Sequence, residues 1–377
     1  MAPEQPAGPR SGDAREPEIN KFFRAAIRTE AGDIHLKVGQ SLKLRIHGQL
    51  KETTGEVITE EKMEEYVFEM LSPSQKEFFL KNNTVDFAHE IGDEGRFRVN
   101  IFRQRGVISL AARRVNTLIP PLDSLNLPPI LKKICDERQG LVLIVGPTGC
   151  GKTTTIASMI DYINATRTCH ILTIEDPIEY LFKDKRSIVS QREIGIDVQD
   201  FDEALKYLMR QDPDVVFVGE MRDVKTATAA MRASETGHLV FGTMYAAGAT
   251  QAVQRLMDMF NQNDRNLARQ TFSLTLRAII GQMLLPCIKE GIKRIPAVEI
   301  ILAHPEVKKL IAEGHEVDLP NVIRNCQEEG MQDLTDSLCK LVKNGSIDPK
   351  DAYKCAPNVD ELKMAIKGIR ASTGGIL

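Results

Sequence analysis

The sequence predicts an α/β protein in which a mostly parallel sheet follows a smaller α+β domain. From Gln139 onward, short apolar runs typical of buried strands alternate with helical patterns, as a parallel sheet with helical connections requires. Before that point, alternating strand-like stretches surround two short helical patterns. The length of 377 residues fits about two to three domains, which agrees with this division.

The first predicted domain covers residues 18–115 and follows a tail, residues 1–17, that is rich in proline, glycine and charge. We expect this tail to be disordered, because it has too little apolar surface to bury. The expected elements of the domain are helices over 19–28 and 59–71, two strands around Gly39 within 33–51, and strands within 95–115. Gly39, Gly95 and Gly106 are the expected turn positions.

A proline-dense segment, residues 116–138, predicts a linker to the second domain, residues 139–350. After about Pro296 the chain becomes helical and polar, with a clear amphipathic pattern over 331–344. For residues 351–377 we expect a C-terminal helix and a flexible tail.

Composition and charge exclude several classes of protein. With 42% apolar and 27% charged residues, the chain is neither a disordered scaffold nor a collagen-like rod. A net charge of −3 gives no overall attraction to nucleic acid or anionic lipid. The seven cysteines form no CxxC pair, so we interpret them as reduced thiols. The N-terminal residues lack the apolar segment of a signal peptide, and we therefore expect a cytoplasmic protein.

The most specific motif is GPTGCGKT at 146–153, which matches G-x-x-x-x-G-K-[ST] between an apolar strand and a helical pattern. Its glycines let backbone amides turn toward phosphate oxygens, and the following helix adds partial positive charge. Lys152 is expected to reach the β- and γ-phosphates of ATP, and the Thr153 hydroxyl to bind Mg²⁺. The predicted nucleotide-binding residues are Gly146, Pro147, Thr148, Gly149, Cys150, Gly151, Lys152, Thr153 and Thr154.

Cys150 lies inside this motif, next to a helix start and a lysine, both of which lower the pKa of a thiol. Redox control of nucleotide binding is therefore a minor hypothesis. The main interpretation is a small side chain tolerated between two glycines.

Three carboxylates follow apolar strands and are candidates for the chemistry at the phosphates. Glu175 and Asp176 follow HILTI, and Glu220 follows DVVFVG. Ligands of open α/β sheets bind beyond the carboxyl ends of the strands, so these side chains should point at the phosphate loop. We expect Glu220 to orient or deprotonate the attacking water, Glu175 to organise water or metal, and Asp176 to hold Mg²⁺. The alternative is that these residues cap the helices that follow.

His238, Arg98 and Arg105 are weaker candidates. His238 precedes the apolar run LVFGTM, where a histidine is more often a hydrogen-bonded structural residue than a contact to the γ-phosphate. Arg98 and Arg105 belong to the stretch RFRVNIFRQRG, residues 96–106. Arginine stabilises charge on a transferring phosphoryl group, but a solvated basic face would give the same pattern.

Together, these blocks resemble the secretion-ATPase superfamily, and most closely the PilT-like retraction motors of type IV pili. The resemblance runs from about residue 20 to 350. The matching pieces are GDIHLKVGQ, LRIHGQL, RFRVNIFRQRG, GPTGCGKTTTIASMIDYIN, HILTIEDPIEY, SQREIGID, DPDVVFVGEMRD and SETGHLVFGT. The resemblance implies a PAS-like N-terminal domain, a RecA-like P-loop ATPase domain and a ring of six copies.

The same resemblance implies roles for individual residues. It assigns 146–153 to Walker A, Glu175 and Asp176 to the Asp box, Glu220 to Walker B and His238 to the His box. It also implies that arginines of the block 96–106 approach the nucleotide, which raises Arg98 and Arg105 as catalytic candidates.

The chain departs from the family pattern at two places and lacks a feature of some relatives. Assembly and type II secretion ATPases typically carry a four-cysteine zinc motif, but the corresponding stretch here has only Cys287, so we expect no zinc. The family commonly reads FGTLHTT where this chain reads FGTMYAA, with Tyr245 in place of a histidine. The retraction signature AIRNLI appears as EVKKLI at 306–311.

We therefore expect a cytoplasmic, Mg²⁺-dependent hexameric ATPase that powers type IV pilus retraction from the inner membrane through a pilus platform protein. One alternative is a PilU-like accessory ATPase that hydrolyses ATP weakly and assists a paralogous motor, and a related secretion or pilus assembly ATPase is another. A motor that acts on nucleic acid is disfavoured by the net negative charge.

Overall fold

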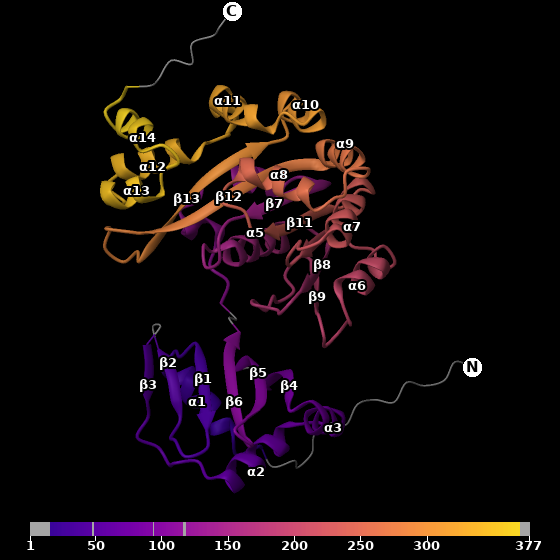
Figure 1. Ribbon diagram of the computed structural model, residues 1–377, viewed down its shortest axis with the longest axis vertical. Coiled ribbons are helices and arrows are strands. Elements are labelled where there is room, and N and C mark those ends of the chain that lie inside the picture. Colours follow the sequence, from indigo (N-terminus) through magenta and orange to yellow (C-terminus); the bar gives the residue numbers. More distant parts are fainter. Residues whose placement is uncertain (1–15, 47–48, 93, 116–117, 370–377) are drawn as a thin grey trace, which may run out of the picture. The chain divides into compact units, whose positions relative to one another are not determined.

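The computed structural model describes residues 16–46, 49–92, 94–115 and 118–369, and the chain divides into two compact units after residue 117 (Figure 1). Nearly all of the expected N-terminal tail, and the last residues of the expected C-terminal tail, lie outside the described residues. Within the described residues, no helix is both long and apolar enough to cross a membrane.

The first unit is an antiparallel sheet with helices. Its elements are α1 (Asn20–Arg28), β1 (Asp33–Lys37), β2 (Lys43–Ile46), β3 (Gln49–Glu52), α2 (Glu60–Met70), α3 (Pro73–Asn82), β4 (Thr84–Ile91), β5 (Gly95–Gln104) and β6 (Val107–Val115). The strands lie in the order β3-β2-β1-β6-β5-β4, and each neighbouring pair is antiparallel. Along β5 the side chains of Phe97, Val99 and Ile101 are buried while those between them are more exposed, as period-two alternation requires.

Three elements of this unit differ from the expectation. The stretch 33–51 contains three strands rather than two, and neither α3 nor β4 was predicted. The sequence does carry a start signal for α3, because Ser72 and Gln75 form a capping box and Pro73 occupies the first turn. Gly95 begins β5 rather than a turn, whereas Gly106 has φ +85° in the turn between β5 and β6.

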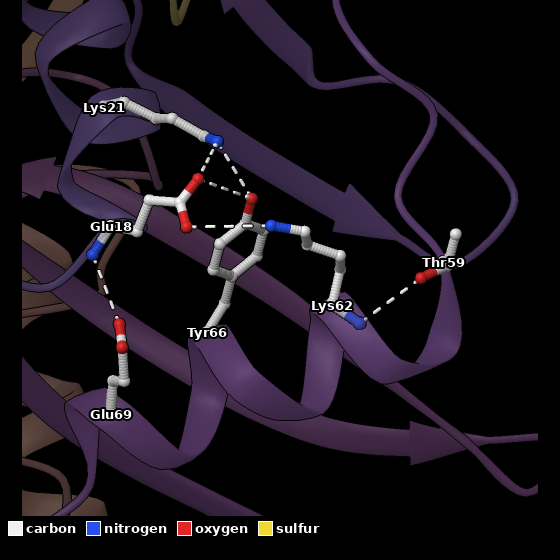
Figure 2. Close-up of polar contacts among 6 residues, drawn as sticks. All are labelled: Glu18, Lys21, Thr59, Lys62, Tyr66 and Glu69. Carbon is white, nitrogen blue, oxygen red and sulfur yellow. Dashed lines mark hydrogen bonds and ion pairs between the residues drawn. The ribbon is translucent and has the colours of Figure 1, made fainter.

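A polar cluster links Glu18 and Lys21, at the start of α1, to Lys62 and Tyr66 of α2 (Figure 2). Lys21 Nζ lies 2.7 Å from Glu18 Oε1 and 2.8 Å from the Tyr66 hydroxyl, and Lys62 Nζ lies 3.7 Å from Glu18 Oε2. The Thr59 hydroxyl accepts the Lys62 backbone N–H at the start of α2, as the sequence predicts for this helix. Most of these charges are half exposed, so the cluster orients the two helices more than it stabilises the unit.

The second unit begins with η1 (Leu122–Leu125) and α4 (Ile130–Cys135), within the segment expected to be a linker. This segment packs into the core of the second unit, because apolar residues lie between its prolines. Its buried residues are Leu122, Leu131, Ile134 and Cys135. The remaining elements are β7 (Gly140–Val145), α5 (Lys152–Thr166), β8 (His170–Glu175), β9 (Ile188–Glu193), α6 (Phe201–Leu208), β10 (Val215–Val218), α7 (Val224–Glu235), β11 (Leu239–Met244), α8 (Ala249–Asp258), α9 (Arg265–Thr275), β12 (Leu276–Pro286), β13 (Arg294–Leu302), α10 (Pro305–Glu313), η2 (Glu316–Asp318), α11 (Leu319–Asn325), η3 (Gln327–Glu329), α12 (Leu334–Lys343), α13 (Pro349–Cys355) and α14 (Val359–Ile366).

The sheet of this unit has the order β13-β12-β7-β11-β10-β8-β9, and every neighbouring pair except β12–β13 is parallel. Successive residues of β7 pack on opposite faces. Leu141 and Leu143 join the core that contains buried residues of α6 to α11, whereas Val142 and Ile144 join the core that contains buried residues of α4 and α5. The predicted α/β class with a mostly parallel sheet is confirmed. Pro296 lies within β13, so the helical region begins later than expected.

Candidate functional site: a cavity at the carboxyl ends of the central strands

The phosphate loop connects β7 to α5, and its backbone conformation requires glycine. Gly146, Gly149 and Gly151 have φ of +154°, +77° and +90°. A Cβ at Gly146 would clash with the carbonyl oxygen of Gln282, and one at Gly151 would lie 2.9 Å from Gln282 Nε2. The loop is therefore held both by its own torsions and by close approach to β12.

Gln282 of β12 braces this loop from beneath. Its Nε2 donates to the Cys150 carbonyl at 2.7 Å, and its Oε1 accepts from the Thr155 hydroxyl at 2.8 Å. The side chain is buried, so both hydrogen bonds are shielded from water. No local motif marks this residue, because it lies about 130 residues from its partners and β12 was not predicted.

The register of the central strands brings their carboxyl ends to one edge. Val218 of β10 pairs with Ile174 of β8, and Met244 of β11 pairs with Val145 of β7. The residues that follow these positions line a cavity of about 350 Å³. Its lining comprises Thr148, Gly149, Gly151, Lys152, Thr153, Thr154, Glu175, Asp176, Pro177, Glu179, Phe217, Gly219, Glu220, Thr243, Tyr245, Leu284 and Arg294.

Most of the predicted site residues thus meet in one cavity. The loop residues Gly146, Pro147 and Cys150 do not line it. Arg294, at the start of β13, is a lining residue that the sequence analysis missed. Recognising the hairpin of β12 and β13 in the sequence would have indicated this residue, because Arg294 pairs with Pro286 there.

Lys152 is folded back onto the loop. Its Nζ donates to the carbonyl oxygens of Gly146 at 2.9 Å and Pro147 at 3.1 Å. On its other side, the same Nζ lies 4.4 Å from the ring centroid of Tyr245, within the range of a cation–π contact. Tyr245 is the residue that replaces the histidine of the family pattern.

Two carboxylates share one arginine on the facing wall. Arg222 Nη2 lies 2.6 Å from Glu220 Oε2, and Arg222 Nη1 lies 3.9 Å from Asp176 Oδ2. The Arg222 side chain is 57% exposed, whereas that of Glu220 is 16% exposed. The arginine therefore covers Glu220 from the solvent side and supplies positive charge between the two acids.

Glu175 is the buried acid of the site. The Thr173 hydroxyl and the Gln191 amide donate to its Oε1 at 2.7 Å and 3.2 Å. Burial nevertheless dominates and raises the pKa of Glu175 to about 7, because desolvation disfavours the charged form. Burial therefore favours the protonated, uncharged form of this carboxyl relative to an exposed glutamate.

His238 lies at the opposite end of β11 from the cavity. Its Nδ1 is 2.9 Å from the Ala233 carbonyl oxygen and 3.2 Å from the Thr236 hydroxyl. At about 3.3 Å per residue, the strand separates His238 from Tyr245 by roughly 20 Å. His238 does not line the cavity, and the role that the family resemblance implies stays a prediction.

Arg98 and Arg105 lie in the first unit. Arg98 of β5 pairs with Asp86 of β4 at 3.9 Å, and Arg105 has φ +50° in the turn before Gly106. Arg98 is 42% exposed, so its weak ion pair leaves the guanidinium available. The predicted approach of these arginines to a nucleotide stays a prediction.

Cys150 is almost fully buried, and burial raises the pKa of its thiol although Lys152 lowers it. A protonated, inaccessible thiol is a poor redox sensor, which favours the interpretation as a small packed side chain.

One cluster of the described residues has the composition of a metal site. His304, Cys326 and Glu329 place one ligand atom each within 4.8 Å of one another. His304 Nδ1, however, accepts the Glu306 backbone N–H at the start of α10, which leaves the ring proton on Nε2, 3.8 Å from Glu329 Oε1. A helix cap with a neighbouring carboxylate accounts for this cluster.

The comparisons with known proteins agree with one another. The family described as type II/IV secretion system protein matches residues 125–348. A twitching motility protein of Neisseria gonorrhoeae is 38% identical over 89% of either chain. The chain belongs to the type II/IV secretion system protein family. The match contains the phosphate loop, the three carboxylates and the brace Gln282.

Two further relatives place this type II/IV secretion system protein among those of pili. The type IV pilus ATPase PilU of Pseudomonas aeruginosa is 36% identical, over 93% of this chain and 91% of PilU. The crystal structure of the pilus retraction motor PilT with bound ADP gives a TM-score of 0.85 at 40% identity, over 92% of this chain and 99% of that one. The predicted resemblance to the PilT and PilU branch is confirmed.

Proposed function

We propose that this chain is a Mg²⁺-dependent ATPase that powers type IV pilus retraction. The observation that carries the proposal is the cavity in which Lys152 and the phosphate loop face Glu175, Asp176 and Glu220. Lysine and inward-facing amides suit phosphates, and the facing acids suit a divalent cation and a water nucleophile. The part of the proposal that concerns the pilus is supported by the names of the relatives, which are a twitching motility protein, PilU and PilT.

The loop fits a polyphosphate. Its glycines adopt torsions that other residues avoid, and α5 begins at Lys152, so the N-terminus of a fifteen-residue helix points at the loop. Thr153 and Asp176 line the same cavity and carry the oxygen ligands that Mg²⁺ prefers. When bound, Mg²⁺ neutralises charge on the transferring phosphoryl group.

The chain's own side chains then divide the work. Lys152 leaves the carbonyls of Gly146 and Pro147 and binds the phosphates. Glu220 accepts the proton of the attacking water, once Arg222 has moved away from its carboxylate. Glu175, with a pKa near neutrality, holds or releases a proton beside that water.

Assembly and location follow from the same proposal. We expect six copies in a ring, with Arg98, Arg105 and His238 contributing across subunit boundaries, on the cytoplasmic side of the inner membrane against a pilus platform protein. A paralogous pilus ATPase is a further expected partner. We expect no stimulation by nucleic acid and no zinc requirement.

Steady-state ATP hydrolysis by the purified protein with Mg²⁺ tests the enzymatic part. We expect Lys152→Ala to weaken the binding of ADP and ATP and to abolish turnover, and Glu220→Gln to lower turnover by about 10²–10⁴-fold while ATP still binds. Glu235→Gln, on the exposed end of α7 and outside the cavity, is the matched control. Turnover that survives Glu220→Gln would contradict the assignment of the base.

An accessory ATPase is the second candidate, favoured by the contact between Tyr245 and Lys152 and by the likeness to PilU. ATP binding without measurable turnover in the parent protein would select it. For the pilus itself, a chromosomal Lys152→Ala allele in the native cell should abolish the retraction-dependent spread of colonies. Wild-type spread would contradict the retraction role.

A further inference from the structure

The cavity contains an interaction that nucleotide binding must break. Within the described part of the chain, the Lys152 ammonium contacts the carbonyl oxygens of Gly146 and Pro147 and the ring of Tyr245. The two carbonyls belong to the loop itself, whereas Tyr245 belongs to the segment after β11. The ring is therefore the partner that a side-chain substitution can remove.

We propose that Tyr245 is a positioning residue that competes with the phosphates of a bound nucleotide for the Lys152 ammonium, and so sets the affinity for nucleoside di- and triphosphates. This inference rests on the proposed function. With the ring in place, the cation–π contact is lost when the lysine moves to the phosphates, so the net free energy of nucleotide binding is less favourable. Without the ring, no cation–π contact is lost when the ammonium moves to the phosphates.

The size of the effect follows from exposure. Tyr245 is 37% exposed, and the cavity is open to water, so the contact belongs to the weaker class of cation–π interactions. Such contacts change an equilibrium by about two- to fivefold. The phosphates of a bound nucleotide therefore still displace Tyr245 from Lys152, but the affinity for the nucleotide is measurably lower than it would be without the ring.

The chain offers a matched control for the loss of an exposed tyrosine beside a lysine. Tyr207 on α6 is 38% exposed, and Lys206 Nζ lies 5.6 Å from its ring centroid. Tyr207 does not line the cavity. Tyr207→Leu thus repeats the chemical change of Tyr245→Leu away from the phosphate loop. Tyr245→Phe keeps the ring and removes only the hydroxyl.

Calorimetric titration of the full chain with AMP, ADP and a non-hydrolysable ATP analogue tests the inference. We expect Tyr245→Leu to bind ADP and the analogue about two- to fivefold more tightly than the parent. AMP affinity should not change, because Lys152 is expected to reach the β- and γ-phosphates, which AMP lacks. Tyr245→Phe should group with the parent, and so should Tyr207→Leu.

A double-mutant cycle separates this role from a general effect on the fold. In a Lys152→Ala background, the effect of Tyr245→Leu on ADP should vanish, because no ammonium remains to compete for. Weaker ADP binding by Tyr245→Leu, an equal change with AMP, or an effect that survives in Lys152→Ala would each overturn the inference. If Tyr245→Leu does not fold, Tyr245→Trp serves instead, and the stronger ring should weaken ADP binding.

The same titrations distinguish failure of the inference from failure of the proposed function. A parent chain that binds neither ADP nor the analogue overturns the proposed function, and the inference with it. A parent chain that binds both, with no gain in Tyr245→Leu, overturns the inference alone.

Discussion

Arg222 Nη2 lies 2.6 Å from Glu220 Oε2, a charge-assisted contact to the carboxylate that is expected to act as base. The same guanidinium reaches Asp176, the expected ligand of the cation, at 3.9 Å. Under the proposed function, one positive charge therefore lies where Mg²⁺ and the attacking water would need negative charge. Arg222 must leave, or be displaced, when the site is loaded.

Replacing this guanidinium with a neutral side chain should make divalent cations bind more readily. In Arg222→Gln, the carboxylates of Glu220 and Asp176 lose their shared counterion, so their negative potential acts on Mg²⁺ alone. A change of about 1 kcal/mol, the interaction of unit charges at about 4 Å in water, lowers the half-saturating Mg²⁺ about fivefold.

The measurement is nucleotide binding at fixed nucleotide and increasing Mg²⁺, with Arg232→Gln on the exposed side of α7 as control. A half-saturating Mg²⁺ that rises in Arg222→Gln would show that the arginine supports the cation site instead of competing with it.

Gln282→Leu should destabilise the second unit and loosen the phosphate loop. The leucine fills a similar volume but leaves the Cys150 carbonyl and the Thr155 hydroxyl without their partner in a buried setting. An unsatisfied buried group costs about 1–3 kcal/mol, so the loss of two partners should lower the free energy of unfolding by about 2–6 kcal/mol.

Denaturant unfolding of both proteins measures this loss. Gln254→Leu, on the exposed face of α8, is the control and should change stability by less than about 0.5 kcal/mol. Equal stability of Gln282→Leu and its parent would mean that the loop holds its shape without the brace.

The sequence was sufficient where chemistry and local pattern coincide. The phosphate loop has a fixed spacing of Gly, Lys and Thr, and Glu220 and Asp176 follow apolar runs, so parallel strand ends bring them together. Gln282 and Arg294 could not be found in this way, because only the pairing of β12 with β7 and β13 carries them to the site. His238 has the opposite problem, because its strand was predicted correctly but the residue lies at the far end.

The secondary structure predicted from the sequence was wrong where tertiary packing overrides the local sequence signals. β13 continues through Pro296, which reads locally as the end of a strand, because β12 pairs with β13 along its whole length. α4 forms inside a proline-dense segment because Leu131 and Ile134 reach the core between β7 and α5. Neither the pairing of β12 with β13 nor the packing of α4 produces a periodic hydrophobic pattern that the local sequence would reveal.

Glu175→Gln should remove a pH dependence of stability. The usual pKa of this acid, 4.5, is raised to about 7 in the fold, so between these values the folded chain binds more protons than the unfolded one. The free energy of unfolding therefore falls as the pH rises through about 4.5 to 7, and the stability present below this window is lost above it. A shift of about 2.5 pKa units corresponds to about 3 kcal/mol for so buried a group.

Denaturant midpoints of the second unit's transition at pH 5 and pH 8 give the measurement. The parent should lose stability over this interval by up to about 3 kcal/mol more than Glu175→Gln, whose amide keeps the contacts to Thr173 and Gln191 without ionising. Glu235→Gln, exposed on α7, should follow the parent. Parallel pH profiles for Glu175→Gln and the parent would mean that Glu175 is ionised throughout, and the proton held near neutral pH would then have to reside on another group of the cavity.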